Sequence, residues 1–414
     1  MTERTIASNR LAPVRRGLLW RGIAAAIAVF VSTEVQAQKP AGYKTSAASA
    51  IVMDHASGAV LFQSNADELR PPASMSKLMT LAVVFKALKE GRLRFEDDVL
   101  CSENAWRRGG APSRTSAMFI PINTKVTVAE IIRGLIVQSG NDAAIAIAEH
   151  MAGSEAAFAR LMDAEARRIG LTLSTFANAS GLPQDGHLMT TRELAHLARF
   201  LMTEYPDYYP LFAEKEFKFR KHLFRNRNPA LSADVRGDGL KTGFTSEAGY
   251  GVVGSVARDG RRLIVVLAGL STSIVRNDEL QRIVDWGFKG FAPYKLIEGR
   301  QIVGRARVWG GEQLYVPLTG GDDDVSVLLP RLPARQRVAA EIVYNGPLKA
   351  PIAKGQRVAV LRTRGALNNT VNEVPLYAAE DVAQGSIIRR GLDSMAMLAF
   401  RWVADQASGL IEKL

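Results

Sequence analysis

The sequence predicts an α+β fold, in which an antiparallel sheet is flanked by helices and is followed by a small all-β domain and a C-terminal amphipathic helix. Three observations predict it. Strand-like apolar runs joined by short turns occur near both ends of residues 45–293, with helix-forming stretches between them. Residues 296–384 change to short alternating runs separated by Gly and Pro. Residues 386–414 repeat apolar side chains at steps of three and four.

Length, composition and charge narrow the class of protein. The 414 residues are enough for two or three domains, and 47% hydrophobic with 23% charged residues describes an ordinary folded chain. The net charge of +12 suits an anionic surface such as a phospholipid or a cell-wall polymer. We expect no nucleic-acid partner, because no nucleic-acid motif occurs. The lone cysteine, Cys101, has no partner for an internal disulfide.

The N-terminus, residues 1–37, predicts a secretory signal peptide. Arg15, Arg16 and Arg21 form a basic region, and the apolar run that follows is too short for a comfortable membrane span. Small residues end the segment and predict cleavage after Ala37. We therefore expect an exported, periplasmic protein, with an uncleaved anchor as the alternative.

The elements of residues 45–293 follow from local signals. A hairpin is predicted near each end, and a capping box, Thr127 with Glu130, predicts a helix that stops at Gln138. Residues 91–127 carry clustered Gly, Pro and Arg and are expected to be irregular. The predicted strands are 48–54, 59–63, 250–257 and 262–269. The other predicted helices are 75–90, 143–152, 158–169, 190–203 and a stretch from 276 toward 286.

The pair Ser74 and Lys77 is the first candidate for chemistry. Pro71 and Pro72 precede a run of good helix formers, so this serine lies near a helix start and the lysine lies one turn later. A serine hydroxyl is a weak nucleophile until a base takes its proton, and a lysine with a lowered pKa can be that base. Taken alone, the pair is better explained as a capping serine followed by a solvated lysine.

Two further tripeptides favour the catalytic interpretation of Ser74 and Lys77. Ser139-Gly140-Asn141 falls in a predicted turn between helices, and Lys241-Thr242-Gly243 enters a predicted strand. Each alone indicates little: the first is a plain Asn/Gly turn, and Ser102 with Asn104 repeats its spacing without a preceding helix. Together, in this order after Ser74 and Lys77, they form the ordered set of the penicillin-recognising serine acyltransferases.

The chain resembles, more narrowly, a low-molecular-weight penicillin-binding protein of the D-alanyl-D-alanine carboxypeptidase family (peptidase family S11). The resemblance covers residues 45–290 well and the last third more loosely. One departure is Phe244, where many members carry a polar residue such as His. The segments that carry the resemblance are 72–77, 136–143, 179–182, 238–245 and 286–288.

The resemblance implies the penicillin-binding-protein/β-lactamase-like fold and a serine mechanism. Ser74 would attack the D-Ala-D-Ala bond of a peptidoglycan stem peptide, Lys77 would accept its proton, and Ser139 would relay a proton to the leaving D-Ala. Penicillin would enter the same path and stall as an acyl-enzyme. The implied substrate-binding residues are Asn141, Lys241, Thr242, Gly243, Phe244, Arg276 and, as a weaker candidate, Arg227.

Two other functions compete with this hypothesis. A β-lactamase of the same fold is the nearest, although the β domain, the C-terminal helix and the absence of an evident Glu-x-x-Leu-Asn deacylation motif argue against it. A catalytically idle wall-binding protein is the second. Five scattered histidines form no metal-ligand motif, so we expect no metal and no other cofactor.

The C-terminal segment, 386–414, is too polar to span a bilayer. Its apolar stripe predicts an interfacial anchor that attaches the protein to the outer face of the inner membrane. The alternative is a helix packed on its own β domain or on a partner.

Overall fold

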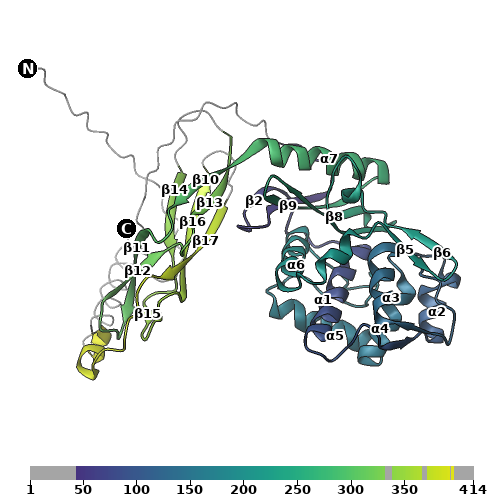
Figure 1. Cartoon of the computed structure of the whole chain (residues 1–414), viewed down its shortest axis with the longest axis horizontal. Coiled ribbons are helices and arrows are strands. Elements are labelled where there is room, and N and C mark those ends of the chain that lie inside the picture. The colour runs from purple at the N-terminus through teal and green to yellow at the C-terminus, as the bar shows by residue number, and fades with distance from the viewer. Residues whose placement is uncertain (1–42, 332–337, 366–370, 392, 396–414) are drawn as a thin grey trace, which may run out of the picture.

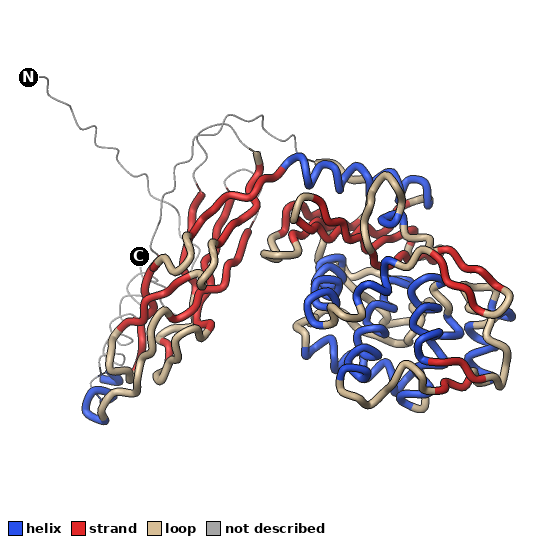
Figure 2. Tube along the Cα trace, viewed as in Figure 1, coloured by secondary structure: helices blue, strands red, loops and turns tan. Residues whose placement is uncertain are grey.

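The computed structural model describes residues 43–331, 338–365, 371–391 and 393–395. They form a body of helices and sheet, from which helix α7 (Ser273–Gly290) leads directly into a body made of strands (Figures 1 and 2). The predicted signal peptide and residues 396–414 of the predicted C-terminal helix lie outside the described residues.

A five-stranded antiparallel sheet organises the first body. Its strand order is β2-β1-β9-β8-β7, so segments from the two ends of this region pair with each other. The two predicted hairpins are confirmed as β1 with β2 and β8 with β9, and the second is closed by a tight turn at Asp259 and Gly260, both with positive φ. The strands are β1 (Ser49–Asp54), β2 (Val60–Ser64), β7 (Gly239–Thr245), β8 (Gly249–Arg258) and β9 (Arg261–Leu270).

Alternation along the strands gives the sheet two apolar faces. On β9, Ile264 and Val266 belong to the core under the helices, whereas Leu263 and Val265 belong to the core under α7. Successive side chains of a strand point to opposite faces, so both faces must be covered. Helices α1 and α6 cover one face and α7 covers the other.

Helix α1 (Lys77–Lys89) is buried along almost its whole length. Its run Leu78–Ala82 is fully buried, because a helix that is apolar on all sides belongs inside a protein. A 3-10 turn, η1 (Ala73–Ser76), precedes it. The remaining helices are α2 (Glu103–Gly109), α3 (Val128–Arg133), α4 (Asn141–Ala152), α5 (Glu155–Arg168) and α6 (Thr191–Glu204).

The expectation of irregular structure over 91–127 is wrong in part. The segment contains β3 (Asp98–Leu100), β4 (Lys125–Thr127) and α2, whose N-cap Ser102 accepts a hydrogen bond from the Ala105 N–H. These elements are too short to show a clear period in the sequence. A hairpin that the sequence analysis does not predict is formed by β5 (Glu216–Phe219) and β6 (His222–Arg225).

The second body is made of strands, as the alternating pattern predicts. Six of them form one sheet in the order β14-β16-β17-β12-β11-β15, and β10 pairs with β13. Strand β10 begins at Phe291, immediately after α7. The ring of Phe291 packs edge-on against that of Trp286, with the ring centroids 5.1 Å apart. The strands are β10 (Phe291–Ile297), β11 (Ile302–Trp309), β12 (Tyr315–Thr319), β13 (Val325–Pro330), β14 (Val338–Val343), β15 (Leu348–Lys349), β16 (Arg357–Gly365) and β17 (Val371–Ala378).

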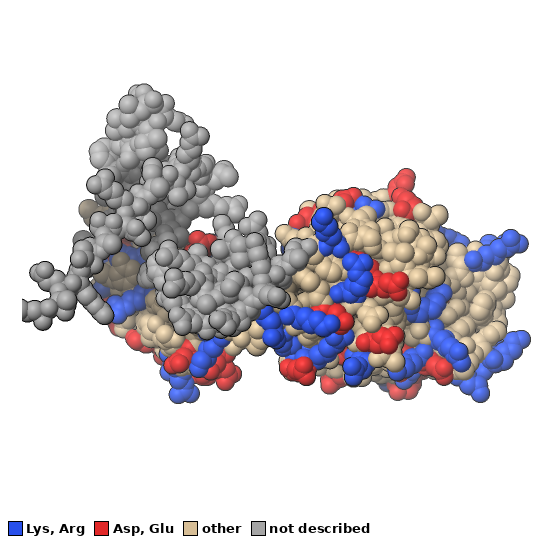
Figure 3. All heavy atoms as spheres, turned by 90° about the horizontal axis from the view of Figure 1, so that it is seen from above, with Lys and Arg blue, Asp and Glu red and all other residues tan. Residues whose placement is uncertain are grey.

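The described part of the C-terminal segment is helical at 387–391 and 393–395. Three of its apolar side chains are exposed, namely Ile387, Ile388 and Met395. None of the helices in the described ranges has the length and apolar character needed to cross a bilayer. Acidic and basic side chains are interspersed over the first body on the face seen in Figure 3.

Candidate active site

Ser74 lies in η1, held against the sheet and a neighbouring loop. Gly181, with φ +77°, packs so closely that a Cβ there would lie 2.0 Å from the Ala73 carbonyl oxygen. On the other side, a Cβ at Gly243 would lie 2.9 Å from the Pro72 carbonyl oxygen. Glycine at both positions lets two backbone segments clamp the turn that carries this serine.

Lys77 begins α1 and reaches three groups with its ammonium. Its Nζ lies 2.9 Å from Ser74 Oγ and 2.7 Å from Asn141 Oδ1, and it also donates to the Ser180 carbonyl. The predicted meeting of Ser74 and Lys77 across one helical turn is therefore observed. These bonds fix the amine at the hydroxyl, which is the geometry that a serine and its base require.

Burial makes this lysine a suitable base. Its side chain is fully buried, and removal from water lowers the pKa of Lys77 from 10.5 to about 7. This pKa already includes a smaller lowering by the Arg227 guanidinium and an opposing effect of the carboxylates of Asp142 and Glu155. A large part of the lysine population is thus neutral near pH 7 and can accept a proton.

The turn between α3 and α4 brings the second motif to the same place. The predicted capping box is present, and η3 (Gly134–Gln138), a π-helical turn, carries the chain to Ser139 in the left-handed conformation at φ +63°. Ser139 Oγ is buried and makes no hydrogen bond within the described residues. Asn141 opens α4 and donates to Thr115 Oγ1 at 2.9 Å while it accepts from the lysine.

The third motif lies on β7, at the edge of the five-stranded sheet. Lys241 is buried, with its Nζ donating to the Thr242 carbonyl at 3.3 Å. Burial, followed by the positive charges of Lys77, Arg227 and Arg276, holds the pKa of Lys241 well below its usual range. An anion that bound among these cations would relieve their mutual repulsion.

The two predicted arginines lie near this cationic group but have protein partners. Arg227 donates to the Gln138 carbonyl at 2.7 Å and to Ser116 Oγ at 3.2 Å. Arg276, at the start of α7, is buried and donates to Asn277 Oδ1 at 3.0 Å. Burial lowers the pKa of Arg276.

Phe244 follows Gly243 on β7 and is 53% exposed. Its ring lies 4.1 Å from that of Tyr250 on β8, centroid to centroid. Tyr250 in turn lies under the Arg276 guanidinium, at 5.9 Å. The aromatic side chain of Phe244 therefore packs across to β8, on the residue that pairs with it in the sheet.

The structure adds residues to which the sequence assigned no role. Asn178 Oδ1 accepts from the N–H groups of Ser180 and Gly181, at 3.1 and 2.7 Å, and so orients the carbonyl that receives the lysine. Thr115 holds the amide of Asn141. The segment 179–182 is part of the resemblance to the family. Its contact with Lys77, through the Ser180 carbonyl, is visible only in the folded structure.

Metal-ligating side chains do not gather at this site. Throughout the described ranges, no group of three or more His, Cys, Asp or Glu side chains is arranged to hold a metal ion.

The family models agree with this arrangement. The model described as D-alanyl-D-alanine carboxypeptidase, peptidase S11, matches residues 33–272. The chain belongs to this family. The model described as the C-terminal domain of penicillin-binding protein 5 matches residues 291–384. The resemblance found in the sequence is confirmed, and so is the penicillin-binding-protein type of fold with a β domain after the helix-and-sheet body.

Individual relatives and solved structures match between 59% and 93% of this chain. The D-alanyl-D-alanine carboxypeptidase DacC of Escherichia coli (strain K12) is 37% identical over 391 residues, which are 93% of this chain and 97% of the relative. The crystal structure of penicillin binding protein 5 from Haemophilus influenzae matches with a TM-score of 0.69 and 33% identity over 83% of this chain and 99% of that chain. Penicillin-Binding Protein D2 from Listeria monocytogenes in its ampicillin-bound form matches with a TM-score of 0.53 and 28% identity over 59% of this chain and 98% of that chain.

Proposed function

We propose that this protein is a serine-type D-Ala-D-Ala carboxypeptidase that removes the terminal D-Ala from peptidoglycan stem peptides through an acyl-enzyme. One observation carries the proposal: Lys77 Nζ lies 2.9 Å from Ser74 Oγ and is fully buried, with a pKa near 7. Family membership supports the substrate, since the relatives are named for this activity. The β-lactamase and the idle wall-binding protein are not favoured by these comparisons.

In the first step, Ser74 Oγ attacks the carbonyl of the D-Ala-D-Ala bond while neutral Lys77 accepts the hydroxyl proton. Ser139 passes its hydroxyl proton to the nitrogen of the leaving D-Ala and takes up the proton that Lys77 accepted, so the amide C–N bond breaks and the lysine returns to its neutral form. Its hydroxyl makes no hydrogen bond in the described part of the chain, so it is free to engage an arriving substrate. Asn141 holds the lysine and, with its amide, the backbone of the substrate.

The negative charge that forms on the attacked carbonyl is held by the backbone N–H groups of Ser74 and Phe244. Each such donor typically contributes about 2.7–4 kcal/mol to transition-state stabilisation. A phenylalanine can serve as well as a polar residue here, because only its N–H is used.

The terminal carboxylate of the substrate binds at the cationic end of β7. Lys241 and Thr242 supply an ammonium and a hydroxyl, and Arg276 adds positive charge, with Arg227 beside Ser116 as a weaker contributor. The absence of a side chain at Gly243 lets the strand approach η1 closely enough for both ends of the substrate to be held.

Water then hydrolyses the ester on Ser74. A β-lactam follows the same path and remains as a long-lived ester, because its leaving group stays attached. The ampicillin-bound form of the Listeria relative is consistent with this trapping.

We propose that the remaining segments bring this activity to the cell envelope. Residues 1–37 direct export, residues 45–293 carry the chemistry, and residues 296–384 form a stalk. Residues 386–414 attach the protein to the outer face of the inner membrane, and the exposed Ile387 and Ile388 support such an apolar contact.

The test is release of D-Ala from diacetyl-Lys-D-Ala-D-Ala by the mature protein and by Ser74→Ala. We expect hydrolysis by the wild type and a rate reduced by at least about 10³-fold in the variant, since its site then lacks the nucleophile. Equal rates in both proteins would refute the serine mechanism. No release by the wild type would refute the proposed activity.

A further inference from the structure

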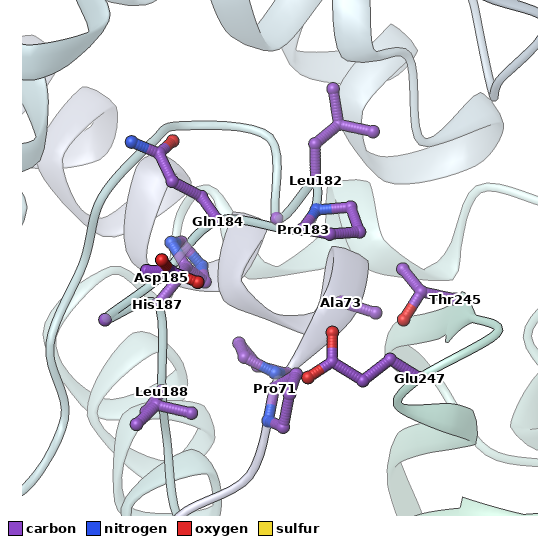
Figure 4. A pocket seen from close by; sticks show the side chains of 13 residues that line it. Pro71, Ala73, Leu182, Pro183, Gln184, Asp185, His187, Leu188, Thr245 and Glu247 are labelled. Carbon is purple, nitrogen blue, oxygen red and sulfur yellow. The ribbon is translucent and has the colours of Figure 1, made fainter.

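A cavity of about 290 Å³ borders the nucleophile turn (Figure 4). Pro71, Ala73 and the loop 182–188 line it, so it belongs to the proposed substrate site. The β5–β6 hairpin, residues 216–225, lines no part of that cavity and has no role in the proposed chemistry. The proposed function therefore leaves this hairpin unexplained.

The hairpin is strongly basic. Its residues include Lys218, Arg220, Lys221 and Arg225, but a single acidic residue, Glu216. All five of these side chains belong to exposed residues. Within the described ranges, the one ion pair that these cations form joins Arg225 to Glu216 at 3.2 Å. Three positive charges are therefore left without a carboxylate partner in the described part of the chain.

The strand register gives the hairpin two different faces. Phe217 pairs with Phe224, and both side chains are buried, so this face attaches the hairpin to the body. On the opposite face, Lys218 lies across from Leu223, which is 56% exposed. Because side chains alternate along a strand, the buried phenylalanines hold this second face toward solvent.

The turn at the tip of the hairpin holds a cation in a conformation that suits glycine. Arg220 has φ +52°, and its guanidinium lies over the Phe219 ring, 5.4 Å from the centroid. Two-residue hairpin turns favour Gly, Asn or Asp where φ is positive, because a larger side chain is strained there. The geometry of the turn therefore does not account for the arginine, whereas a need for charge at the tip does.

The position of the hairpin indicates what it binds. Both strands contact η3, which leads to Ser139, and Arg227, two residues after β6, donates to the Gln138 carbonyl. Figure 1 shows β5 and β6 at the end of the helix-and-sheet body that lies away from the strand body. The predicted membrane anchor follows the strand body in the sequence. A partner of the hairpin therefore lies on the side of the active site and not on the side of the membrane.

We propose that the β5–β6 hairpin is a docking surface for the anionic peptidoglycan polymer, at a distance from the stem peptide that is being cleaved. The proposal rests on the proposed function, whose substrate ends in a carboxylate, so that a polymer with many stem peptides carries many negative charges. Lys218, Arg220 and Lys221 bind carboxylates of neighbouring stem peptides, and Leu223 adds an apolar contact. Docking raises the effective concentration of stem peptides at the site and favours the polymer over free peptides.

The test compares a polymeric with a soluble substrate. The mature protein and the triple variant Lys218→Gln, Arg220→Gln, Lys221→Gln are sedimented with lipid-free peptidoglycan that keeps its D-Ala-D-Ala ends. Release of D-Ala is measured from this polymer and from diacetyl-Lys-D-Ala-D-Ala. We expect the variant to bind the polymer about tenfold more weakly at low salt, roughly two- to threefold for each lost charge, with kcat/KM for the soluble peptide unchanged. The difference should shrink as salt screens the charges.

The matched control removes three exposed cations outside the hairpin, by Arg160→Gln, Arg167→Gln and Lys354→Gln, so that the net charge changes equally. This control should keep wild-type binding to the polymer. Arg220→Gly is a second hairpin variant that should fold well, because glycine suits φ +52°. Its binding to the polymer should still fall about two- to threefold.

The outcomes separate the docking surface from its alternatives. Equal binding to the polymer by the hairpin variant and the control would overturn the proposal, because only the overall charge would then matter. If the hairpin variant lost binding to anionic lipid vesicles and not to the polymer, the partner would be a membrane and the proposal would be wrong. If the wild type bound the polymer through the hairpin but released D-Ala from neither substrate, the proposed function would have failed while the docking surface stood.

Discussion

At the scale of single residues, the site depends on one buried amine. Lys77 is surrounded by Ser74, Asn141 and the Ser180 carbonyl, so its ammonium has partners but no carboxylate in hydrogen-bond contact within the described residues. Desolvation therefore outweighs the stabilisation of its charge, and its pKa falls to about 7. The same serine and lysine on a solvated helix would be chemically inert at neutral pH.

The first prediction concerns the pH dependence of acylation. Protonated Lys77 cannot accept the serine proton, so the acylation rate with penicillin should rise about tenfold per pH unit below the lysine pKa and level off above about pH 7. Rapid-quench measurements from about pH 5 to pH 9 give the profile. In Lys77→Arg, the side chain stays charged and the rise should disappear along with most of the rate. A wild-type profile that is flat or falls with pH would contradict the role of this lysine.

Residue-level reasoning from the sequence finds this pair because residues three apart share a helix face. It also puts Asn141 in the set, through the order of the motifs. It misses Asn178 and Thr115, because their hydrogen bonds depend on how loops fold back on the site. No local pattern fixes such contacts.

At the scale of elements, the nucleophile turn is positioned by close backbone packing. Gly181 presses on Ala73 from the loop, and Gly243 presses on Pro72 from β7. These contacts leave no room for a side chain, so the position of Ser74 depends on the absence of a Cβ at both glycines.

The second prediction uses two glycines of the same loop. Gly181 and Gly186 both have φ +77°, but only at the first would a Cβ meet backbone, at 2.0 Å, whereas the second has open space. Gly181→Ala should lower the free energy of unfolding by about 2–4 kcal/mol and slow acylation. Gly186→Ala should cost only about 1 kcal/mol, for the backbone strain. Denaturant unfolding measures both, and equal losses would mean that the Ala73 contact is not tight.

Long or strongly patterned elements are predictable from the sequence, and short ones are not. The capping box, the helix after it and both sheet hairpins follow from local sequence. Helix α2 and strands β3 and β4 are not predicted from the sequence, because elements of three to seven residues show no clear hydrophobic period. The amino-acid composition changes near Phe291. Tertiary contact nevertheless continues across this position, because Phe291 begins β10 and packs on Trp286.

At the scale of the whole molecule, a helix-and-sheet body is joined to a strand body without a loose linker. Helix α7 ends at Gly290 and β10 begins at the next residue. Phe291 and Leu328 of the strand body also belong to the apolar core under α7. The two bodies are thus connected by packing as well as by the chain.

The third prediction concerns membrane attachment, which remains a prediction for residues 386–414. The protein lacking residues 1–37 should co-sediment with vesicles that contain anionic lipid, and a form that also lacks 386–414 should stay in the supernatant with its activity intact. Neutral vesicles serve as the control, since the basic chain should bind them less. Equal sedimentation of both forms would mean that residues 386–414 are not the membrane anchor.

The central claim is that Ser74 is an activated nucleophile that forms an acyl-enzyme. The measurement that tests it most directly is intact-mass spectrometry of the mature protein after mixing with penicillin, with the adduct located by peptide mapping. The account predicts one lasting adduct, on Ser74, that Ser74→Ala abolishes. Rapid loss of penicillin without a lasting adduct would indicate a β-lactamase, and neither adduct nor turnover would contradict the activated serine altogether.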